Sequence, residues 1–492
     1  MDWTRFQRVI THTFEQYPRP EPPQMSADCS FSRVLEASRQ GWMAAGGEDT
    51  LLSLALPLDG IDPLQALPVL ADQAPFQMLM DGAPGLCLAA AGSCQQLELD
   101  GARRFELAQR FADLSLSRLV DTRPVCPAQA RPRVVLRFRF FDQVGEHHHG
   151  VMHPPAVEAV LPRWQLTRQG RRGWLRLNGV VNATAEARNL AEQLWLKWEQ
   201  LQKELPQVAS SRSPTQLTNG NTEHWKQRYS RAVERGIDLV NEGELHKLVL
   251  AVRHTIDLDT HFNPLPLLQR LRRQQAGSCR FLWQRNADDA FFGASPERLL
   301  SLRGGWLRSD ALAGTAGEGD DGNQLLRSDK DRREHELVVD TLTNQLLQMG
   351  LTPCRRRQPQ LARHGQLTHL HTPITAEVQD RPVLRLAEQL HPTPAVAGLP
   401  RREAMAWLRT LEPFERGCYA APIGWIDSAG DAELRVAIRC GHARGHHLDL
   451  TAGAGLVRGS IAERERQEVE LKLAVLADQL KLQTRDRSRS IV

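Results

Sequence analysis

The sequence predicts an α+β fold. Two observations support this class. Short strand-like runs bounded by turn residues occur in both halves of the 492-residue chain, and the helical segments do not alternate with them in a βαβ rhythm. A chain of this length exceeds the size at which a single core stops growing. We therefore expect one large domain with insertions, or two lobes around a shared core.

The N-terminal part, residues 1–215, contains three strand-like runs that begin at Leu51, Arg133 and Gly173. A helix is predicted from about Thr184. Its apolar residues recur at spacings of four, four and three, so they form one buried stripe: Leu190, Leu194, Trp198 and Leu201. The polar, Ser/Thr/Pro-rich segment 206–221 is predicted to be a linker or a long surface loop.

The C-terminal part, residues 216–492, contains both predicted helices and predicted strands, and strands rather than a βαβ rhythm dominate it. Strands are expected from His246, from Phe291 (this one followed by a turn) and along the segment that starts at Glu433. Helices are expected from Lys330 and from Ile461 to the end of the regular pattern. The N-terminal strands are expected to join the same fold.

Composition excludes several classes of function. Lys and Arg total 62 against 58 Asp and Glu, so no charge excess points to nucleic acid or a membrane surface. The eight cysteines include no C-x-x-C pair, which indicates reduced thiols rather than a metal site or disulfide framework. No apolar run reaches the length of a membrane span, and the N-terminus lacks a signal-peptide pattern. A cytoplasmic protein is expected, a monomer by default with a homodimer as the alternative.

The last predicted helix has an acidic face beside its apolar stripe. Glu465, Glu468 and Lys472 fall at i, i+3 and i+7 and so project together. Glu334 lies on the helix that starts at Lys330. If Glu334 and Glu468 converge, they form a hard oxygen site of the kind that Mg²⁺ uses with substrate oxygens and water. Taken alone, each carboxylate is better explained as a solvated helix charge.

Three other motifs are poor candidates for a site. The triplet 147–149 is all histidine, but adjacent residues of a strand point to opposite faces, so a surface loop is the better interpretation. The Gly-rich segment from Asp310 lacks the Lys-Ser/Thr of a P-loop and the spacing of a dinucleotide fingerprint. Ser295 does not lie in a G-x-S-x-G elbow, which argues against a serine hydrolase.

Ten blocks of the second half, in order, resemble the chorismate-utilising enzyme family, which includes isochorismate and salicylate synthases and the component I chains of anthranilate and aminodeoxychorismate synthases. The N-terminal 200 residues match far more loosely. The blocks are KLVLAVR (247–253), FFGASPERL (291–299), LAGTAGEG (312–319), SDKDRREHELVVD (328–340), HLHTPI (369–374), LHPTPAVAG (390–398), FERGCYAAPIGW (414–425), LRVAIRC (434–440), AGAGLVRGS (452–460) and ERQEVELKLA (465–474).

The resemblance implies two packed antiparallel sheets with outer helices and a central cleft. It also implies roles for individual residues. Lys247 matches the general base that activates water, and Glu297 the general acid. Glu334 and Glu468 match the Mg²⁺ ligands, and Glu465 is a candidate water-mediated partner of the ion. From their positions alone, Lys247 reads as a strand-edge charge and Glu297 as a turn charge.

The same resemblance implies a set of substrate-binding positions. Tyr419, Arg439 and Lys472 match residues that hold the carboxylates of chorismate, and His369 matches an active-site histidine. Glycine amides are expected beside them. The full set is Gly314, Thr315, His369, Ala395, Tyr419, Arg439, Gly453, Gly455 and Lys472.

The chemistry requires these residue types. Conversion of chorismate to isochorismate adds water at C2 and expels the C4 hydroxyl, so a base and an acid are needed on opposite sides of the ring. A lysine acts as a base only where burial or nearby cations lower its pKa. A glutamate acts as an acid only where an apolar wall or negative charge raises its pKa. Mg²⁺ neutralises the ring carboxylate and positions the substrate.

Two departures separate this chain from the aminating members of the family. Ala395 stands where those enzymes have a threonine, and the segment from Gly314 reads G-T-A-G-E-G rather than G-T-R-P-R-G. Isochorismate synthase is the favoured member, for quinone or siderophore synthesis, with the long N-terminal part more like the quinone-pathway enzymes. A salicylate synthase is the alternative within the family, and a catalytically silent chorismate-binding relative is the alternative of another class. Cys418 and His371 are further departures at positions without an assigned role.

Overall fold

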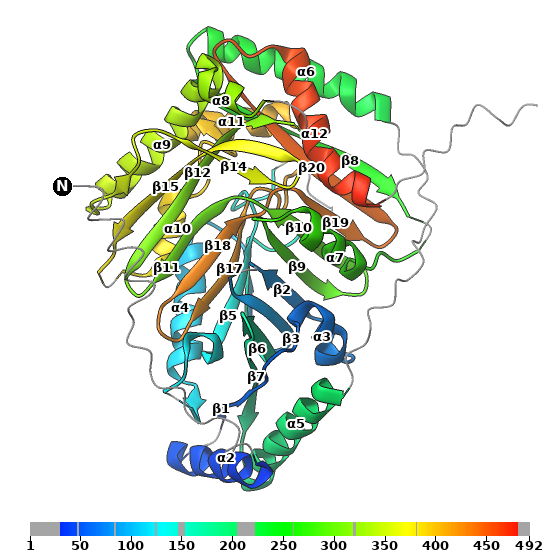
Figure 1. Ribbon diagram of the computed structural model, residues 1–492, viewed down its shortest axis with the longest axis vertical. Coiled ribbons are helices and arrows are strands. Elements are labelled where there is room, and N and C mark those ends of the chain that lie inside the picture. The colour runs from blue at the N-terminus through cyan, green and yellow to red at the C-terminus, as the bar shows by residue number, and fades with distance from the viewer. Residues whose placement is uncertain are drawn as a thin grey trace, which may run out of the picture.

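The structure is a computed structural model that describes residues 30–46, 49–82, 85–123, 125–145, 153–203, 222–258, 260–317, 321–379 and 381–480. It confirms the α+β class, with strands in the middle and helices outside (Figure 1). The linker predicted at 206–221 and the histidine triplet 147–149 lie outside the described residues.

The strands form one hydrogen-bonded network rather than two separate sheets. The long strand β6 (Val157–Gln169) is the reason. One of its edges pairs with β3 (Cys87–Leu99) along almost its whole length. Its other edge is divided between β5 (Arg133–Phe138) and β7 (Arg172–Val181). The two antiparallel layers expected from the resemblance therefore meet at a shared strand.

One layer, called here the first wing, continues from β3 in the order β2 (Gln77–Asp81), β9 (Cys279–Asn286), β10 (Asp289–Ser295), β19 (Cys440–Arg444), β20 (His447–Val457), β8 (Lys247–Asp257) and β16 (Gly398–Leu399). The labels β3, β2, β9, β10, β19, β20 and β8 of this wing can be followed upward from below the middle of Figure 1.

The second wing continues from β5 in the order β17 (Pro422–Asp427), β18 (Ala432–Val436), β11 (Arg298–Arg303), β12 (Trp306–Ala316) and β15 (Leu367–Glu377), with β13 (Cys354–Arg355) and β14 (Gln360–His364) on the outer edge of β15. Beyond β7 lie β1 (Thr50–Pro57) and β4 (Val120–Asp121). The β1–β4 pair is parallel, unlike the other pairs.

Helices cover the outside of these layers. In the N-terminal part, α2 (Phe31–Ala45) and α5 (Thr184–Lys203) pack together over β1 and β7, at the bottom of Figure 1. At the other end, α12 (Ala462–Leu480) packs on β20 and on α6 (Thr222–Asn241), and α9 (Asp329–Gln348) packs on β12 and β15. The remaining helical segments are α3 (Pro63–Ala71), α4 (Arg104–Ser117), η1 (Ala128–Ala130), α7 (Leu265–Gln274), α8 (Asn323–Arg327), α10 (Val383–Leu390) and α11 (Arg401–Leu411).

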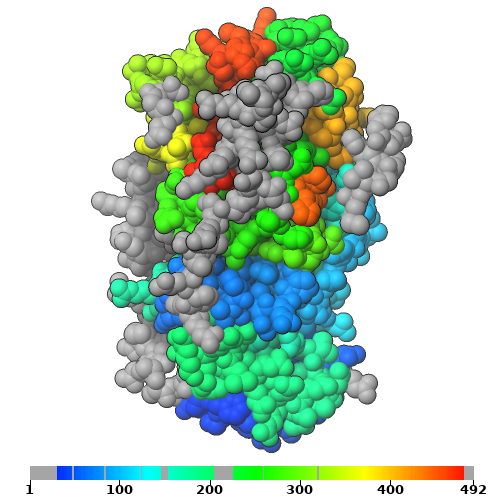
Figure 2. All heavy atoms as spheres, turned by 90° about the vertical axis from the view of Figure 1, so that its right-hand side faces the viewer, coloured from blue at the N-terminus to red at the C-terminus, as the bar shows by residue number. Residues whose placement is uncertain are grey.

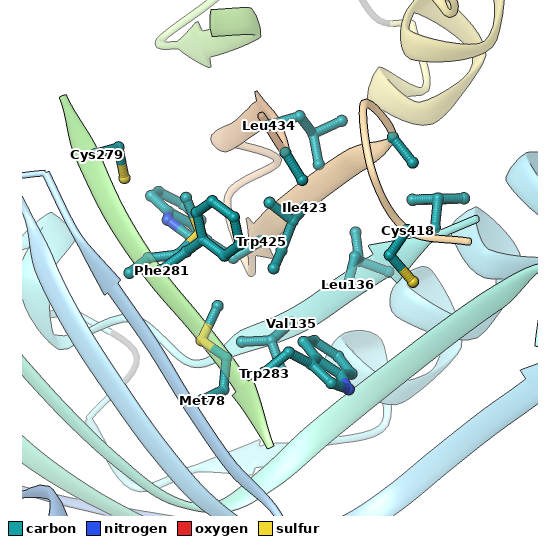
Figure 3. Close-up of a cluster of buried hydrophobic side chains, with 14 of the residues drawn as sticks. Met78, Val135, Leu136, Cys279, Phe281, Trp283, Cys418, Ile423, Trp425 and Leu434 are labelled. Carbon is teal, nitrogen blue, oxygen red and sulfur yellow. The ribbon is translucent and has the colours of Figure 1, made fainter. Parts of the chain in front are cut away.

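The N-terminal part contributes strands to both wings. In the first wing β2 pairs with β9, and in the second β5 pairs with β17, although each pair joins segments about 200 residues or more apart. Side chains from all four strands meet in one buried cluster, in which Met78, Leu136, Phe281 and Trp425 are examples (Figure 3). Figure 2 shows the blue and teal N-terminal segments mostly below the green to red C-terminal ones.

One expected strand is wrong. The segment from Glu433 was predicted to be a single strand, but β18 ends at Val436 and β19 begins at Cys440. Between them the chain crosses from the second wing to the first. Arg439, in this crossing, has φ +51, the left-handed region that a side chain seldom adopts. Of the helices described, none combines the length and apolar character needed to cross a membrane.

Candidate active site

A cavity lies where the crossing between the wings meets β8, β20, α9 and α12. All the residues predicted from the sequence to form the site line this cavity, with the exception of Glu465. The cavity has about 650 Å³ of free space, which is continuous with solvent. Its other lining residues are mainly apolar: Val249, Pro296, Leu312, Ala313, Val396, Ile438 and Ala452.

Lys247 is the first residue of β8 and is 1% exposed. Its Nζ atom lies 2.9 Å from Oε1 of Glu334, which is also buried and projects from the first turns of α9. Leu248, the next residue, points away into the core, as the two-residue period of a strand requires. The strand therefore directs Lys247 toward the cavity, where Glu334 holds it in an ion pair.

Glu297 lies in the S-P-E turn between β10 and β11 and is 3% exposed. The turn is fixed from both sides: Ser295 Oγ donates to the Val436 carbonyl, and the Val436 amide donates to the Glu297 carbonyl. Thr393 Oγ1 donates to Glu297 Oε1 at 3.3 Å. Burial raises the pKa of Glu297 to about 7, against the smaller lowering effects of Lys247, the Thr393 hydrogen bond and Lys472. At neutral pH this carboxyl is therefore partly protonated.

Glu468 projects from α12 toward the same cavity. Its Oε1 atom accepts a hydrogen bond from Thr315 Oγ1 at 3.0 Å and lies 2.7 Å from the ammonium of Lys472. Burial acts to raise the pKa of Glu468, but Lys472 and Lys330 outweigh it and the pKa is lowered. Lys472 also donates to the Gly453 carbonyl at 2.8 Å, which ties α12 to β20. Glu468 is therefore an anion that faces the cavity.

Glu465 lies one turn before Glu468 and, unlike Glu468, is not among the residues that line the cavity. It is 1% exposed, and its Oε1 atom lies 2.7 Å from the ammonium of Lys330 on α9. Burial acts to lower the pKa of Lys330, but Glu465, Glu334 and Glu468 outweigh it and raise the pKa. Each of the three carboxylates therefore has its own lysine, and neither Glu465 nor Lys330 is among the residues that line the cavity.

His369 and Arg439 form a hydrogen-bonded pair in the cavity. His369 Nδ1 donates to the Gly314 carbonyl at 2.7 Å, so Nε2 is the nitrogen that accepts from Arg439 Nη2. Burial, with the Arg439 guanidinium, lowers the pKa of His369 well below its ordinary value, so the ring is neutral. Burial lowers the pKa of Arg439 to about 10, and Arg439 Nη1 is buried without a hydrogen-bond partner among the described residues. An anion is the natural partner for this group.

Two glycines in the middle of β20 make room for charged side chains. A Cβ atom on Gly455 would lie 2.4 Å from Glu334 Oε1 and 2.9 Å from Lys247 Cε. A Cβ atom on Gly453 would lie 3.1 Å from the hydroxyl of Tyr419, whose pKa burial raises. The sequence predicted these glycines as positions of close approach by a ligand. In the structure their missing side chains are what allows Lys247, Glu334 and Tyr419 to reach the cavity.

The remaining predicted positions also line the cavity. Gly314 has φ +69, and its carbonyl orients His369. Thr315 is hydrogen-bonded to Glu468 and lies 3.4 Å from His369 Nδ1. Ala395 adds a small apolar surface. Glu318 and Gly319, which complete the G-T-A-G-E-G segment, lie outside the described residues.

The sequence interpretation missed two polar residues. Thr393 contacts Glu297 from the HPTPA segment, which was quoted for the resemblance but not searched for hydrogen-bond donors. Lys330 lies in the first turn of α9, the helix that also carries Glu334. The i, i+4 spacing of these two residues was a signal that they share a face. The role of Thr393 depends on its contact with Glu297, and that of Lys330 on its contact with Glu465, and both partners are distant in the sequence.

The carboxylates fit a site for Mg²⁺ that is completed by a ligand. Among the described residues no group of three or more His, Cys, Asp or Glu side chains is arranged to hold a metal ion. Glu334 and Glu468 nevertheless line the same cavity from two helices. Mg²⁺ is usually held by one or two carboxylates, with waters and substrate oxygens in the other positions. The donor set suits this mode of binding.

The arrangement favours acid–base chemistry on a small anion. The cavity walls carry the lysine Lys247 and the carboxyl of Glu297, which is partly protonated at neutral pH. They also carry Arg439, whose Nη1 atom has no hydrogen-bond partner among the described residues. The buried setting strengthens the interaction of each group with a charged ligand. A water-addition and hydroxyl-elimination reaction needs this set of groups.

Comparison with known proteins gives a consistent result over nearly the whole chain. The salicylate biosynthesis isochorismate synthase of Pseudomonas aeruginosa is 31% identical over 473 residues, 93% of this chain and 97% of that protein. Isochorismate synthase MenF of Escherichia coli is 31% identical over 360 residues, 70% of this chain and 81% of that protein.

The fold comparison agrees. The solved structure of MenF, the menaquinone-specific isochorismate synthase from Escherichia coli, superposes with a TM-score of 0.71 at 26% identity, covering 91% of this chain and 100% of that one. A family model described as "Chorismate binding enzyme" matches residues 36–481. The chain belongs to the chorismate binding enzyme family.

Proposed function

We propose that this protein is a Mg²⁺-dependent isochorismate synthase, which interconverts chorismate and isochorismate. The observation that carries the proposal is the presence of a buried lysine, Lys247, and a buried carboxyl with a pKa of about 7, Glu297, in the lining of one cavity. The full-length similarity to isochorismate synthases supports the same reaction.

In this proposal Lys247 removes a proton from the water whose oxygen forms a bond to C2. The ring double bonds shift, the bond between C4 and its hydroxyl breaks, and Glu297 donates the proton with which that hydroxyl leaves as water. A pKa near 7 suits Glu297 to this role, because the carboxyl is protonated in a useful fraction of molecules and still gives up its proton readily. Lys247 acts as a base only when it is uncharged, so its ion pair with Glu334 must open.

Substrate binding is assigned to the cationic part of the cavity. Arg439 Nη1, which has no hydrogen-bond partner in the described part of the chain, is directed to a carboxylate of chorismate, and His369 fixes the other side of the guanidinium. Glu334 and Glu468 would hold Mg²⁺, and the bound ion would neutralise the ring carboxylate. Ala395 has no hydroxyl, so it leaves space for the ring of chorismate where the aminating enzymes have a threonine.

The experiment is a product analysis by liquid chromatography after incubation with chorismate and Mg²⁺, with and without ammonium, and with EDTA as the control. Isochorismate in equilibrium with chorismate, independent of ammonium and absent with EDTA, is the expected result. Salicylate with pyruvate would assign the chain to the alternative activity, and an ammonium-dependent amine would contradict the role given to Ala395. Absence of turnover would favour the silent relative.

The metal assignment has its own test. Replacement of Glu468 by Gln removes a charge from the cavity while keeping the size of the side chain. The affinity of the site for Mg²⁺ and the affinity for chorismate are therefore both expected to fall by about tenfold or more. Glu336→Gln, an exposed carboxylate on α9, is the matched control. An unchanged Mg²⁺ titration in Glu468→Gln would remove this residue from the metal site.

A further inference from the structure

A buried ion pair, Glu412 with Arg416, lies outside the lining of the active-site cavity. Glu412 directly follows α11, and Arg416 lies in the loop that leads to Tyr419. Arg416 Nε donates to Glu412 Oε2 at 2.7 Å and Arg416 Nη2 to Glu412 Oε1 at 2.5 Å, so the contact is bidentate. The two side chains are 0% and 2% exposed, and neither residue lines the cavity. Any effect of the pair on a ligand in the cavity is therefore transmitted by the groups that the pair binds.

The pair completes the outer edge of β8, the strand that carries the proposed base. The inner edge of β8 pairs with β20 along its whole length. On the outer edge the two-residue strand β16 covers only the start of β8. Further along the described part of this edge, side chains take the place of a strand partner. Arg416 Nη2 donates to the Val249 carbonyl and the Ala251 amide donates to Glu412 Oε1, each at 2.7 Å. The two side chains thus bind β8 as a neighbouring strand would.

The same guanidinium also binds the segment that carries Thr393. Arg416 Nη1 donates to the Val396 carbonyl at 2.7 Å. The amides of Val396 and Ala397 donate to the Thr393 carbonyl at 3.1 and 3.0 Å, so these residues form a tight turn that starts at Thr393. Thr393 Oγ1 in turn donates to Glu297 Oε1. One side chain therefore connects the strand of the proposed base with the turn that orients the proposed acid.

The three contacts need the shape of an arginine. Burial acts to lower the pKa of Arg416, but the charge of Glu412 outweighs it and the pKa is raised, so the group stays charged. Each of its three nitrogens has a partner: Glu412, Val249 or Val396. A lysine carries a single compact ammonium without the planar fork, so it cannot reach all three partners in this geometry.

We propose that Arg416 is a positioning residue, which holds β8 and the Thr393 turn in fixed relation so that Lys247 and Glu297 face the same substrate. The inference rests on the proposed function, because it presumes that these two groups act as base and acid. It differs from a purely structural role of the ion pair, which would affect the stability of the fold and leave the chemistry of each folded molecule unchanged.

The test compares Arg416→Lys with the wild type. Rates of chorismate consumption in the presence of Mg²⁺ are measured across the pH range and scaled to the folded fraction, which thermal unfolding gives. The kcat value is expected to fall about ten- to a hundredfold with KM changed by less than about threefold, because the alignment of base and acid is lost while Arg439 remains. The alkaline limb of the kcat/KM profile is expected to move up by a few tenths of a pH unit to about one unit. The reason is that a weakened Thr393 bond no longer favours the charged form of Glu297.

Two further variants serve as controls. Arg176→Lys makes the same change at a fully buried arginine that does not line the cavity, and each of its nitrogens also has a partner. It should lower the stability and leave both the kcat per folded molecule and the alkaline limb unchanged. The double variant Thr393→Val/Arg416→Lys should place the limb where Thr393→Val alone places it, because both changes act on one hydrogen bond.

The outcomes separate the two proposals. If the wild type does not consume chorismate, the proposed function is wrong and the inference fails with it. If the wild type is active and Arg416→Lys keeps the alkaline limb and the kcat per folded molecule, the ion pair is structural, so the inference is wrong and the proposed function stands. A limb that moves further in the double variant than in Thr393→Val also contradicts the inference.

Should Arg416→Lys fail to fold, Glu412→Gln decides the question. This variant removes the charge that holds Arg416 and keeps an oxygen for the Ala251 amide. The kcat value is expected to fall severalfold and the limb to move in the same direction as in Arg416→Lys, by a smaller amount. An unshifted limb with an unchanged kcat per folded molecule contradicts the inference.

Discussion

Two buried arginines, one in the N-terminal part and one in the cavity, illustrate how structural and functional charges differ in this molecule. Arg176 on β7 is fully buried, and each of its three nitrogens has a partner: the Ala130 carbonyl at 2.9 and 2.6 Å, the Ser53 hydroxyl at 2.5 Å and Asp121 at 3.0 Å. Arg439 is buried to nearly the same degree, yet its Nη1 atom lacks a hydrogen-bond partner among the described residues.

The difference has an energetic meaning. A buried donor without a partner destabilises the folded chain by about 1–3 kcal/mol, a cost that an anion accepting from Arg439 Nη1 would remove. Glu297 differs from Arg176 in the same direction, because burial raises its pKa to about 7 against the smaller lowering effects of Lys247 and Thr393. Arg176 is thus matched within the protein, whereas Arg439 Nη1 and the ionised form of Glu297 are not fully matched by the described residues. Each of the following substitutions tests one side of this contrast.

The largest loss of turnover is expected for Lys247→Ala. General acid–base catalysis contributes about 10²–10⁴-fold, and this substitution removes the proposed base while leaving Arg439 in place. Chorismate binding in the presence of Mg²⁺ should be largely retained, which equilibrium dialysis can measure beside the rate. Lys203→Ala, an exposed lysine of α5, is the control. Turnover near the wild-type value would remove the base assignment.

Glu297→Gln should lower turnover by a similar or somewhat smaller factor and also stabilise the fold at high pH. The folded-state pKa of about 7 lies above the ordinary value of 4.5, so ionisation of Glu297 destabilises the folded state progressively from about pH 4.5 to pH 7. The neutral amide avoids this loss. In denaturant unfolding without ligands the variant should match the wild type at pH 4 and exceed it by up to about 3 kcal/mol above pH 7. Equal stability at pH 8 would show that the carboxyl is not desolvated.

Thr393→Val is expected to change activity less and in a pH-dependent way. The Thr393 hydroxyl donates to Glu297 and so favours its charged form. Without this bond the pKa of Glu297 rises further, and the alkaline limb of the kcat/KM profile should move up by a few tenths of a pH unit to about one unit. Thr410→Val removes an exposed hydroxyl that donates to its own helix, and its profile should stay unchanged. A shift of the limb to lower pH would contradict the proposed contact.

Arg176→Met should leave the turnover of the folded enzyme unchanged. It removes the common partner of Ser53, Asp121 and the Ala130 carbonyl, so the free energy of unfolding should fall by about 3–5 kcal/mol. Arg188→Met, which breaks an exposed helical pair with Glu192, should change stability by less than 1 kcal/mol. If turnover per folded molecule falls with Arg176→Met, the contrast between matched and unmatched charges fails.

Much of the local structure was determined by the sequence itself. The strands that begin near Leu51, Arg133 and Gly173 are β1, β5 and β7, and the helices predicted from Thr184 and Ile461 are α5 and α12. The helices carry an apolar stripe at the helical period, and the strands are short apolar runs bounded by turn residues and buried on both faces, so each type of element has a local signal. The order of the ten motifs likewise identified the family without any knowledge of contacts.

Only the tertiary structure decided which residues that are distant in the sequence contact one another. The break at Arg439 exists because the chain changes wings there, and no local pattern encodes that crossing. The pairing of Lys330 with Glu465 and of Thr393 with Glu297 joins residues 135 and 96 positions apart. Periodicity shows which face of an element is buried but not what lies opposite it. Whether a carboxylate is solvated, paired with a lysine or placed to bind a ligand therefore depends on the packing of α9 and α12 against the two wings.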